Sequence, residues 1–201
     1  MNKEQNLYWH DASVSRDERE ALLGQKGVLL WFTGLSSSGK STLANATALA
    51  LHQQGKLTFV LDGDNIRQGL NRNLGFSPGD REENIRRIAE VAKLFTDAGV
   101  ITMTAFISPY RKDRDLARQL IAPDRFIEVY VDASVHTCEK RDQKGLYKKA
   151  RAGEIREFTG ISAPYDPPLN PEIHLDANTI TIDQGRDQIL AFLKKREVVS
   201  F

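Results

Sequence analysis

The stretch Gly34-Leu35-Ser36-Ser37-Ser38-Gly39-Lys40-Ser41-Thr42 constrains the fold of this chain more than any other part of the sequence. It matches the pattern G-x-x-x-x-G-K-[ST], and it lies between an apolar run at 28–33 and a helix-like segment at 43–51. In a strand–loop–helix arrangement, backbone N–H groups of the loop and the N-terminus of the helix bind phosphate oxygens. A Gly/Ser turn that arises by chance would not be expected between a strand and a helix. The sequence therefore predicts a nucleotide phosphate site over 34–42, with Lys40 on the β- and γ-phosphates and Ser41 on Mg²⁺.

Composition excludes several classes of protein. The 201 residues suit one α/β domain, and a net charge of +1 gives no global field that would recruit nucleic acid or a membrane. Cys138 is the only cysteine, which rules out an intramolecular disulfide and fits a reducing compartment. Residues 1–19 contain no apolar signal-peptide core, and no run reaches the roughly 20 apolar residues that span a bilayer. We expect a cytoplasmic location, with neither nucleic acid nor a membrane as a partner.

Strand-like and helix-like segments alternate along the chain. Five apolar runs predict strands over 28–33, 57–61, 100–107, 126–131 and 179–182. Helices are predicted over 15–23, 40–54, 83–98, 111–121, 134–141 and 184–196, the first with a Ser15/Glu18 capping box and that at 111–121 with its charged residues outward. This alternation predicts an α/β fold of three layers, with a central five-stranded parallel sheet and helices on both faces, as one domain over 1–201. Residues 1–26 form a polar lead-in, and the irregular stretches 66–80 and 142–171 predict lids or substrate loops.

Two carboxylates, Asp62 and Asp64, follow the second predicted strand directly. Ligands of open parallel sheets bind at the carboxyl ends of the strands, so these residues are expected beside the phosphate loop. Carboxylates there can hold Mg²⁺, or orient and deprotonate an attacking hydroxyl. The Asp-Gly-Asp-Asn run is also a good turn and helix cap, and the local sequence does not separate the two interpretations. The neighbouring phosphate loop favours the functional one.

Arginines and isolated aromatic residues follow in the polar stretches. Arg67 and Arg81 lie in predicted loops, where they could grip an anionic substrate, whereas Arg86 fits a solvated helix face with i,i+4 ion pairs to glutamates. Phe76 and Phe158 could stack on the two faces of a nucleobase, although each could instead pin its loop to the core. The basic run that includes Arg141 and Lys144 is either a solvated face or a lid over transferring phosphates. Cys138 is expected to be a small core residue.

No Asn-Lys-x-Asp run is present, so the guanine-specificity signal of a GTPase is missing. The residues by themselves indicate a small phosphate-loop kinase with an anionic acceptor. Two alternatives remain at this point: a kinase of another nucleotide or small metabolite, and a nucleotide-binding regulatory module without catalysis. The second would lack Lys40, Asp62 or Asp64, and all three are present.

Several motifs together resemble the adenylylsulfate (APS) kinase family. They are Trp9-His10, Leu61-Asp62-Gly63-Asp64-Asn65, Leu74-Gly75-Phe76-Ser77, Asp80-Arg81-Glu82-Glu83-Asn84, Ile107-Ser108-Pro109-Tyr110-Arg111, Lys144-Gly145-Leu146-Tyr147 and Phe158-Thr159-Gly160-Ile161. The resemblance covers nearly the whole chain. It implies transfer of the γ-phosphoryl group of MgATP to the 3′-hydroxyl of adenosine 5′-phosphosulfate (APS), giving PAPS and ADP in sulfate assimilation.

The resemblance also implies roles for individual residues. The ATP site is 34–42, and Ser41 and Asp62 are the Mg²⁺ ligands. The catalytic residues are Lys40, Asp62, Asp64, Ser108 and Arg141. Ser108 stands where some bacterial members carry a phosphorylated serine, which we treat as a marker because direct in-line transfer needs no covalent intermediate. The APS site is expected to comprise Asp64, Arg67, Phe76, Arg81, Asn84, Ile107, Ser108, Lys144, Leu146, Phe158, Thr159 and Gly160.

The chain departs from the family pattern at two positions. Ser37 stands where glycine is usual, and at positive φ a serine would cost roughly 1–2 kcal/mol, which affects the rigidity of the loop and its affinity for ATP. Tyr165-Asp166 replaces the usual Tyr-Glu, a minor change. Family members are commonly homodimers, and some are fused to ATP sulfurylase. The resemblance therefore implies a homodimer and a functional or covalent link to that enzyme.

Overall fold

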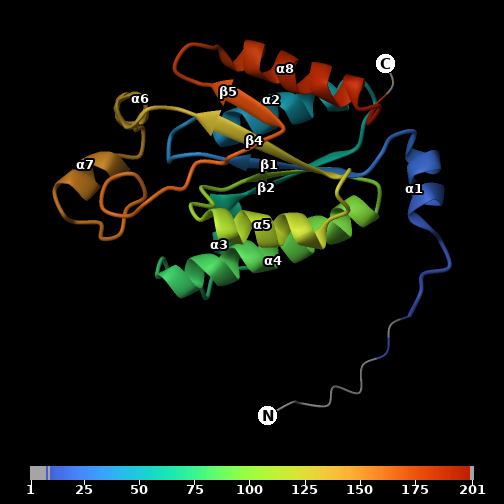
Figure 1. Cartoon of the computed structure of the whole chain (residues 1–201), viewed down its shortest axis with the longest axis horizontal. Coiled ribbons are helices and arrows are strands. Elements are labelled where there is room, and N and C mark those ends of the chain that lie inside the picture. Colours follow the sequence, from blue (N-terminus) through green and yellow to red (C-terminus); the bar gives the residue numbers. More distant parts are fainter. Residues whose placement is uncertain (1–7, 9, 200–201) are drawn as a thin grey trace.

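The computed structural model describes residue 8 and residues 10–199. Trp9, which contributes to the family resemblance, and the first residues of the lead-in lie outside the described residues. Five strands form one parallel sheet in the order β2-β3-β1-β4-β5 (Figure 1). They are β1 (Val28–Thr33), β2 (Thr58–Asp62), β3 (Ile101–Ala105), β4 (Phe126–Asp132) and β5 (Ile173–Asp176). The α/β fold with a central five-stranded parallel sheet is confirmed.

The central strand β1 is buried at every position, as its unbroken apolar sequence predicts. Its side chains alternate between two hydrophobic clusters on opposite faces of the sheet. Leu30 and Phe32 belong to one cluster, whereas Leu29 and Trp31 belong to the other. This alternation gives the sheet a separate core on each face, because successive side chains of a strand point to opposite sides.

Helices cover both faces of the sheet (Figure 1). The helix α2 (Lys40–His52) packs beside α8 (Ile182–Lys195), and α4 (Pro78–Asp97) packs beside α5 (Arg111–Leu120). Four shorter helices complete the described fold: α1 (Arg16–Leu23), α3 (Gly63–Gln68), α6 (Val135–Lys140) and α7 (Leu146–Arg151). The capping box of Ser15 and Glu18 at the start of α1 is confirmed.

The prediction of the fifth strand at 179–182 is wrong. β5 lies earlier, at Ile173–Asp176, where Ile173 and Leu175 are buried and the two residues between and after them are exposed. Thr181 instead caps α8 through a capping box with Gln184. The β-branched run Thr179-Ile180-Thr181-Ile182 has strand propensity, but the T-x-x-Q cap ends that segment by starting a helix.

Two predicted irregular stretches contain helical structure. The helix α4 begins at Pro78 rather than at 83, because Ser77 accepts a hydrogen bond from the Asp80 N–H and Pro78 occupies the first turn. The helix α3 occupies 63–68, and α7 lies inside the predicted lid 142–171. The prediction that α5 keeps its charges outward holds for Lys112 and Asp115, which are exposed, but is wrong for Asp113 and Arg114, which are both 2% exposed.

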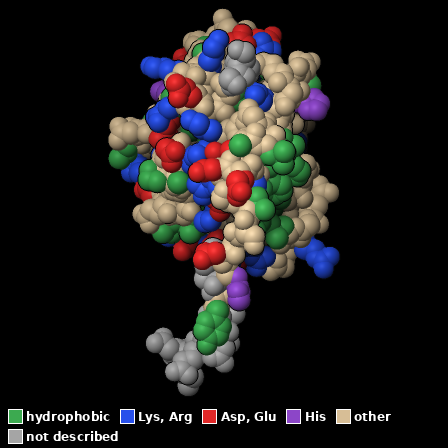
Figure 2. Space-filling model, turned by 90° about the vertical axis from the view of Figure 1, so that its right-hand side faces the viewer, with side chains coloured by type: hydrophobic (Ala, Val, Ile, Leu, Met, Phe, Trp, Pro, Cys, Tyr) green, Lys and Arg blue, Asp and Glu red, His purple; other side chains and the backbone are tan. Residues whose placement is uncertain are grey.

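Charges on the surface are mixed in sign. On the face shown in Figure 2, acidic and basic side chains are interspersed, in keeping with the net charge of +1. Within the described part of the chain, no helix combines the length and the apolar character needed to cross a membrane. Cys138 has no exposed surface and belongs to the core cluster, as predicted.

Candidate active site

The phosphate-binding loop connects the buried end of β1 to the start of α2, as the sequence predicts. Gly34 has φ +145°, and a Cβ atom there would lie 2.4 Å from the carbonyl oxygen of Val131 on β4. Only glycine permits this approach of two backbones. Gly39 at φ +109° precedes α2, and no described side chain caps that helix. The N–H groups of its first turn are therefore available to an anion.

Three side chains hold the carbonyl groups of this loop. The buried ammonium group of Lys40 donates to the Leu35 carbonyl oxygen at 2.5 Å. The Tyr147 hydroxyl of α7 donates to the Ser36 carbonyl oxygen at 3.0 Å, and Arg141 donates to those of Ser38 at 3.4 Å and Ala177 at 2.7 Å. The predicted residues Lys40 and Arg141 thus lie at the loop, and the start of the predicted lid contacts it as well.

Asp62 lies beside the loop at the end of β2. The Ser41 hydroxyl donates to Asp62 Oδ2 at 2.6 Å, and Asp62 Oδ1 accepts from the Asp64 N–H at 3.0 Å, which caps α3. The capping interpretation of Asp62 is therefore confirmed, and its other oxygen remains directed at the phosphate loop. Thr42, next to Ser41, is exposed.

The oxygen pair of Ser41 and Asp62 fits a magnesium ion. Mg²⁺ prefers oxygen ligands and is commonly bound by one or two carboxylates together with substrate phosphates. In the described residues, no group of three or more His, Cys, Asp or Glu side chains is placed to hold a metal ion. A metal bound here would thus depend on nucleotide phosphates for further ligands.

Asp64 and Lys144 form an ion pair between the start of α3 and the segment before α7. This contact raises the pKa of Lys144, chiefly through the hydrogen bond to Asp64. Both side chains are about two-thirds exposed, at 66% and 67%, so solvent screens the pair and it adds little stability. It does bring the predicted lid to one of the predicted catalytic carboxylates.

Phe76 and Phe158 lie on two segments that Arg81 joins. The Arg81 guanidinium donates to the Phe76 carbonyl oxygen at 2.8 Å, to the Thr159 hydroxyl at 2.9 Å and to the Glu157 carbonyl oxygen at 2.7 Å. Phe76 is exposed, whereas Phe158 is buried edge-on against Tyr147. Phe158 therefore does anchor its loop to the core, the alternative considered above, and Phe76 does not.

Arg67 and Asn84 line the same region. The guanidinium of Arg67 lies 4.4 Å from the centre of the Phe76 ring and donates to the Gly75 carbonyl oxygen at 2.9 Å. Burial lowers the pKa of Arg67. The buried Asn84 accepts a hydrogen bond from Asn71 at 3.0 Å. Arg86 forms an ion pair with Glu83 on the exposed side of α4, as the solvated-face interpretation predicts. Glu82 does not pair with Arg86 but with Lys112.

Ser108 is buried in the loop that follows β3. It has φ +41°, and its hydroxyl donates to Thr33 Oγ1 at 3.0 Å and accepts from Trp31 Nε1 at 3.1 Å. The carbonyl oxygen of Ile107 accepts from Thr33 at 2.8 Å. These contacts hold Ser108, which is 2% exposed, in an internal hydrogen-bond network. Backbone strain of this kind is concentrated at functional sites.

The remaining predicted residues of the acceptor site lie around the lid. Gly160 has φ +89°, and a Cβ there would be 3.0 Å from Leu35 of the phosphate loop. Leu146 packs against the core at the start of α7. The structure thus places the phosphate loop, the two carboxylates and parts of the segment 142–171 along the carboxyl edge of the sheet.

Known proteins with similar sequences were found. A family model described as adenylylsulphate kinase matches residues 26–176. The chain belongs to this family. It is 58% identical over 194 residues to an adenylyl-sulfate kinase of Marinobacter nauticus, covering 96% of this chain and 98% of the relative. An adenylyl-sulfate kinase of Lactiplantibacillus plantarum is 58% identical over 200 residues, covering 100% and 97%.

Solved structures of family members have the same fold. The Mycobacterium tuberculosis APS kinase CysC, in complex with AMPPNP and APS, matches with a TM-score of 0.81 at 45% identity and covers 85% of this chain and 99% of its own. A hexameric APS kinase from Thiobacillus denitrificans matches with a TM-score of 0.68 at 32% identity, covering 91% of this chain and 31% of its own. The phosphate-loop fold predicted from the sequence is the fold of this family.

Sequence reasoning missed several residues that build the site. Asp142 caps α7, because its carboxylate accepts from the N–H groups of Leu146 at 2.9 Å and Tyr147 at 2.7 Å. The buried ion pair of Arg114 and Glu128 was also missed. A glutamate within the apolar run Phe-Ile-Glu-Val-Tyr-Val was the available signal, since a charge in a buried strand requires a partner.

We expect relief of backbone strain at Ser37 to stabilise the protein. Ser37 has φ +59°, as anticipated for the position where the family has glycine. Ser37→Gly should have a free energy of unfolding about 1 kcal/mol above that of Ser37→Ala, which keeps the Cβ but loses the hydroxyl. Urea denaturation measures both variants. A lower stability for Ser37→Gly would show that the loop does not strain this residue.

Nucleotide binding is expected to take up protons at moderately alkaline pH. Burial lowers the pKa of Lys40 to about 8, an effect that Asp62 and Asp64 partly oppose. Bound phosphates favour the charged ammonium and raise this pKa, so MgATP binding at the pKa takes up about half a proton, and affinity falls as the pH rises further. Calorimetry in buffers of different ionisation enthalpy measures the uptake. Lys40→Met is the control, and equal uptake in this variant would refute the assignment.

Proposed function

We propose that this protein transfers the γ-phosphoryl group of MgATP to the 3′-hydroxyl of APS, forming PAPS and ADP in sulfate assimilation. Membership of the adenylylsulphate kinase family carries the proposal. The geometry supports it, because a phosphate loop, a carboxylate pair and two aromatic-bearing segments meet at one edge of the sheet. The relative bound to AMPPNP and APS supports the same pair of substrates.

The phosphate loop supplies the charge stabilisation that phosphoryl transfer requires. Backbone N–H groups of 34–42 and the ammonium of Lys40 bind the β- and γ-phosphates, and Arg141 lies beside the loop to stabilise developing charge. A magnesium ion held by Ser41 and Asp62 would neutralise phosphate charge when bound. The acceptor oxygen attacks the γ-phosphorus in line as the bond to the β–γ bridging oxygen breaks, and ADP leaves.

Asp64 is assigned the role of the base, because Asp62 already faces Ser41. The hydroxyl proton passes to the Asp64 carboxylate as the new oxygen–phosphorus bond forms. The ion pair of Lys144 with Asp64 supports a role for the proposed lid at this step. Ser108 is assigned a role in shaping the pocket and does not accept the phosphoryl group, which is consistent with its burial.

We assign the acceptor pocket to the space between the two segments that Arg81 joins, one with Phe76 and the other with Phe158. Phe76 provides an exposed ring for the adenine, and the opposite wall is assigned to Phe158, although its ring also packs against Tyr147 and anchors its loop. Arg67 and Arg81 carry the positive charge that a phosphosulfate group needs, and Asn84 contacts the ribose. Ile107, Leu146, Thr159 and Gly160 complete the lining. The segment 142–171 acts as the lid.

The family resemblance supports further proposals about the setting of the enzyme. We propose a homodimer in the cytoplasm, where ATP is available. The substrate APS requires an enzyme that joins sulfate to an adenylyl group, and ATP sulfurylase fills that role as a functional partner.

A coupled assay of ADP release tests the proposed function. APS, AMP, adenosine and shikimate are compared as acceptors with MgATP, and the product is identified as PAPS. Turnover with APS alone is expected. Turnover with a different acceptor, or ATP binding without turnover on any of them, would refute the proposal.

Replacement of the two carboxylates should have different effects. Asp64→Asn removes the base and is expected to lower kcat by about 10²–10⁴-fold. Asp62→Asn is expected to raise the concentration of Mg²⁺ needed for half-maximal rate, because it removes a charged ligand. Asp187→Asn on the exposed surface of α8 is the control and should match the unmodified enzyme. Near-normal kcat in Asp64→Asn would exclude it as the base.

A further inference from the structure

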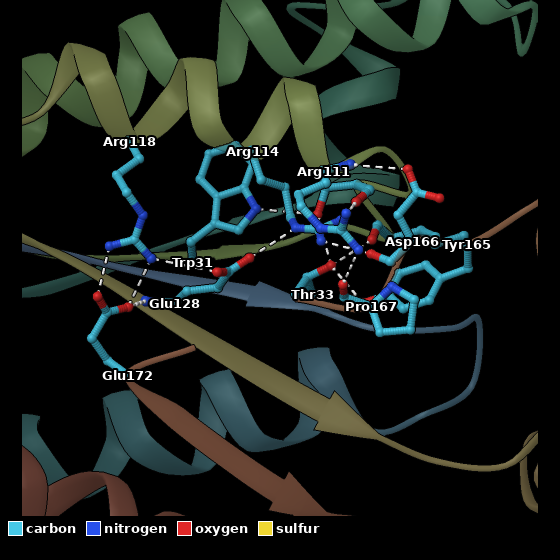
Figure 3. Close-up of polar contacts among 12 residues, drawn as sticks. Trp31, Thr33, Arg111, Arg114, Arg118, Glu128, Tyr165, Asp166, Pro167 and Glu172 are labelled. Atoms are coloured by element: carbon cyan, nitrogen blue, oxygen red, sulfur yellow. Dashed lines mark hydrogen bonds and ion pairs between the residues drawn. The ribbon is translucent and has the colours of Figure 1, made fainter. Parts of the chain in front are cut away.

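Arg114 on α5 is a cation buried at the centre of a polar network that the reaction described above does not use. Its side chain is 1% exposed. Its Nε donates to Glu128 Oε1 on β4 at 2.8 Å, and its two terminal nitrogens donate to the carbonyl oxygens of Ser108 at 2.7 Å and Asp166 at 2.6 Å (Figure 3). A buried charge is costly unless it is fully paired, and here each nitrogen of the guanidinium has an acceptor.

The two carbonyl groups belong to segments far apart in the sequence. Ser108 lies in the loop that follows β3 and has the left-handed φ of +41°, whereas Asp166 follows the loop that contains Phe158, Thr159 and Gly160. Both segments contribute residues to the acceptor pocket proposed above. Arg114 therefore hydrogen-bonds to two segments that line that pocket, and within the described residues none of its hydrogen bonds reaches the phosphate loop.

Neighbouring contacts reinforce the same junction. The Asp166 N–H donates to the Pro109 carbonyl oxygen at 2.8 Å, and Arg111 donates to the Pro167 carbonyl oxygen at 2.9 Å. The Tyr165 hydroxyl lies 3.0 Å from Thr33 Oγ1, which also accepts from Ser108. Figure 3 shows Arg114 between Glu128 and the segment Tyr165–Pro167. The planar fork of arginine satisfies all three directions at once, which a lysine ammonium on a flexible stem does not.

We infer that Arg114 is a positioning residue for the acceptor: it fixes the segment 107–109 relative to the segment 158–166 and so sets the affinity for APS, but not for ATP. This inference rests on the proposed function, since the acceptor is APS. Glu128 holds the arginine in place by pairing with Nε. Charged hydrogen bonds of this kind are the strong class in proteins, and small displacements of a positioned substrate cause large losses in rate.

Arg118, one turn further along α5, is a matched control. It pairs with the same Glu128 at 3.4 Å, with Glu172 at 2.6 Å, and lies over the ring of Phe126. Among the described residues, Arg118 donates to Glu172 and Glu128, and none of its hydrogen bonds reaches 107–109 or 158–166. Arg118→Gln therefore disturbs the same ion-pair network without releasing either wall of the pocket.

The test compares steady-state constants and amide hydrogen exchange in three variants. Arg114→Lys keeps the charge beside Glu128 and should raise the KM for APS at least about tenfold while leaving the KM for MgATP within about twofold. The double variant Arg114→Met with Glu128→Met removes the hydrogen bonds of Arg114 to the two segments and also removes its counter-ion. It therefore tests the inference if Arg114→Lys does not fold. Arg118→Gln should leave both KM values unchanged.

Hydrogen exchange provides a readout that is independent of substrate. Exchange should become faster in 107–111 and in 158–167 in Arg114→Lys, and it should remain slow there in Arg118→Gln. An unchanged KM for APS, an equal rise in both KM values, or unchanged exchange in both segments would overturn the inference. If the unmodified enzyme does not use APS, the proposed function fails on that result alone, and the exchange data still decide whether Arg114 positions the two segments.

Discussion

The close approach of Gly34 to β4 is the constraint on which the rest of the site depends. The phosphate loop can pass over the Val131 carbonyl oxygen only because position 34 has no side chain. From there the chain enters α2, and the orientation of that helix decides where Ser41 meets Asp62. The strand β1 that delivers the loop is buried on both faces, so its position is determined by two cores at once. A rigid scaffold of this kind suits a reaction in which the protein mainly positions reactants.

The path of the strands and the place of the phosphate loop were predictable from the sequence, because apolar periodicity and a glycine-rich turn are local signals. The position of β5 was not predictable in this way. The β-branched run Thr179–Ile182 has strand propensity, but Thr181 in this run caps a helix, and the chain forms α8 there. The start of α4 was likewise predicted too late. There the signal was present in Ser77 and Pro78, whose capping chemistry outweighs the polarity of the stretch.

The candidate site shows a similar division. Asp62 and Asp64 follow β2, and their placement at the carboxyl edge of the sheet followed from the parallel topology, where Ser41 at the start of α2 meets Asp62. Contacts between distant segments could not be predicted in this way. Nothing local in the sequence pairs Tyr147 with the Ser36 carbonyl group, or Arg114 with Glu128, because these pairings depend on how α5 and α7 pack in three dimensions. For the same reason, the prediction that α5 keeps its charges outward was wrong for Arg114, whose partner lies on β4.

The hydrogen bonds of Arg81 have a mechanical consequence. One guanidinium donates hydrogen bonds to the carbonyl groups of Phe76 and Glu157 and to the Thr159 hydroxyl. The segment that leads into α4 and the start of the 158–166 segment are therefore joined through a single side chain. Neither segment can swing away without breaking charged hydrogen bonds to the other. The two sides of the proposed pocket are therefore coupled, and an acceptor too large for it would have to displace both segments together or break these hydrogen bonds.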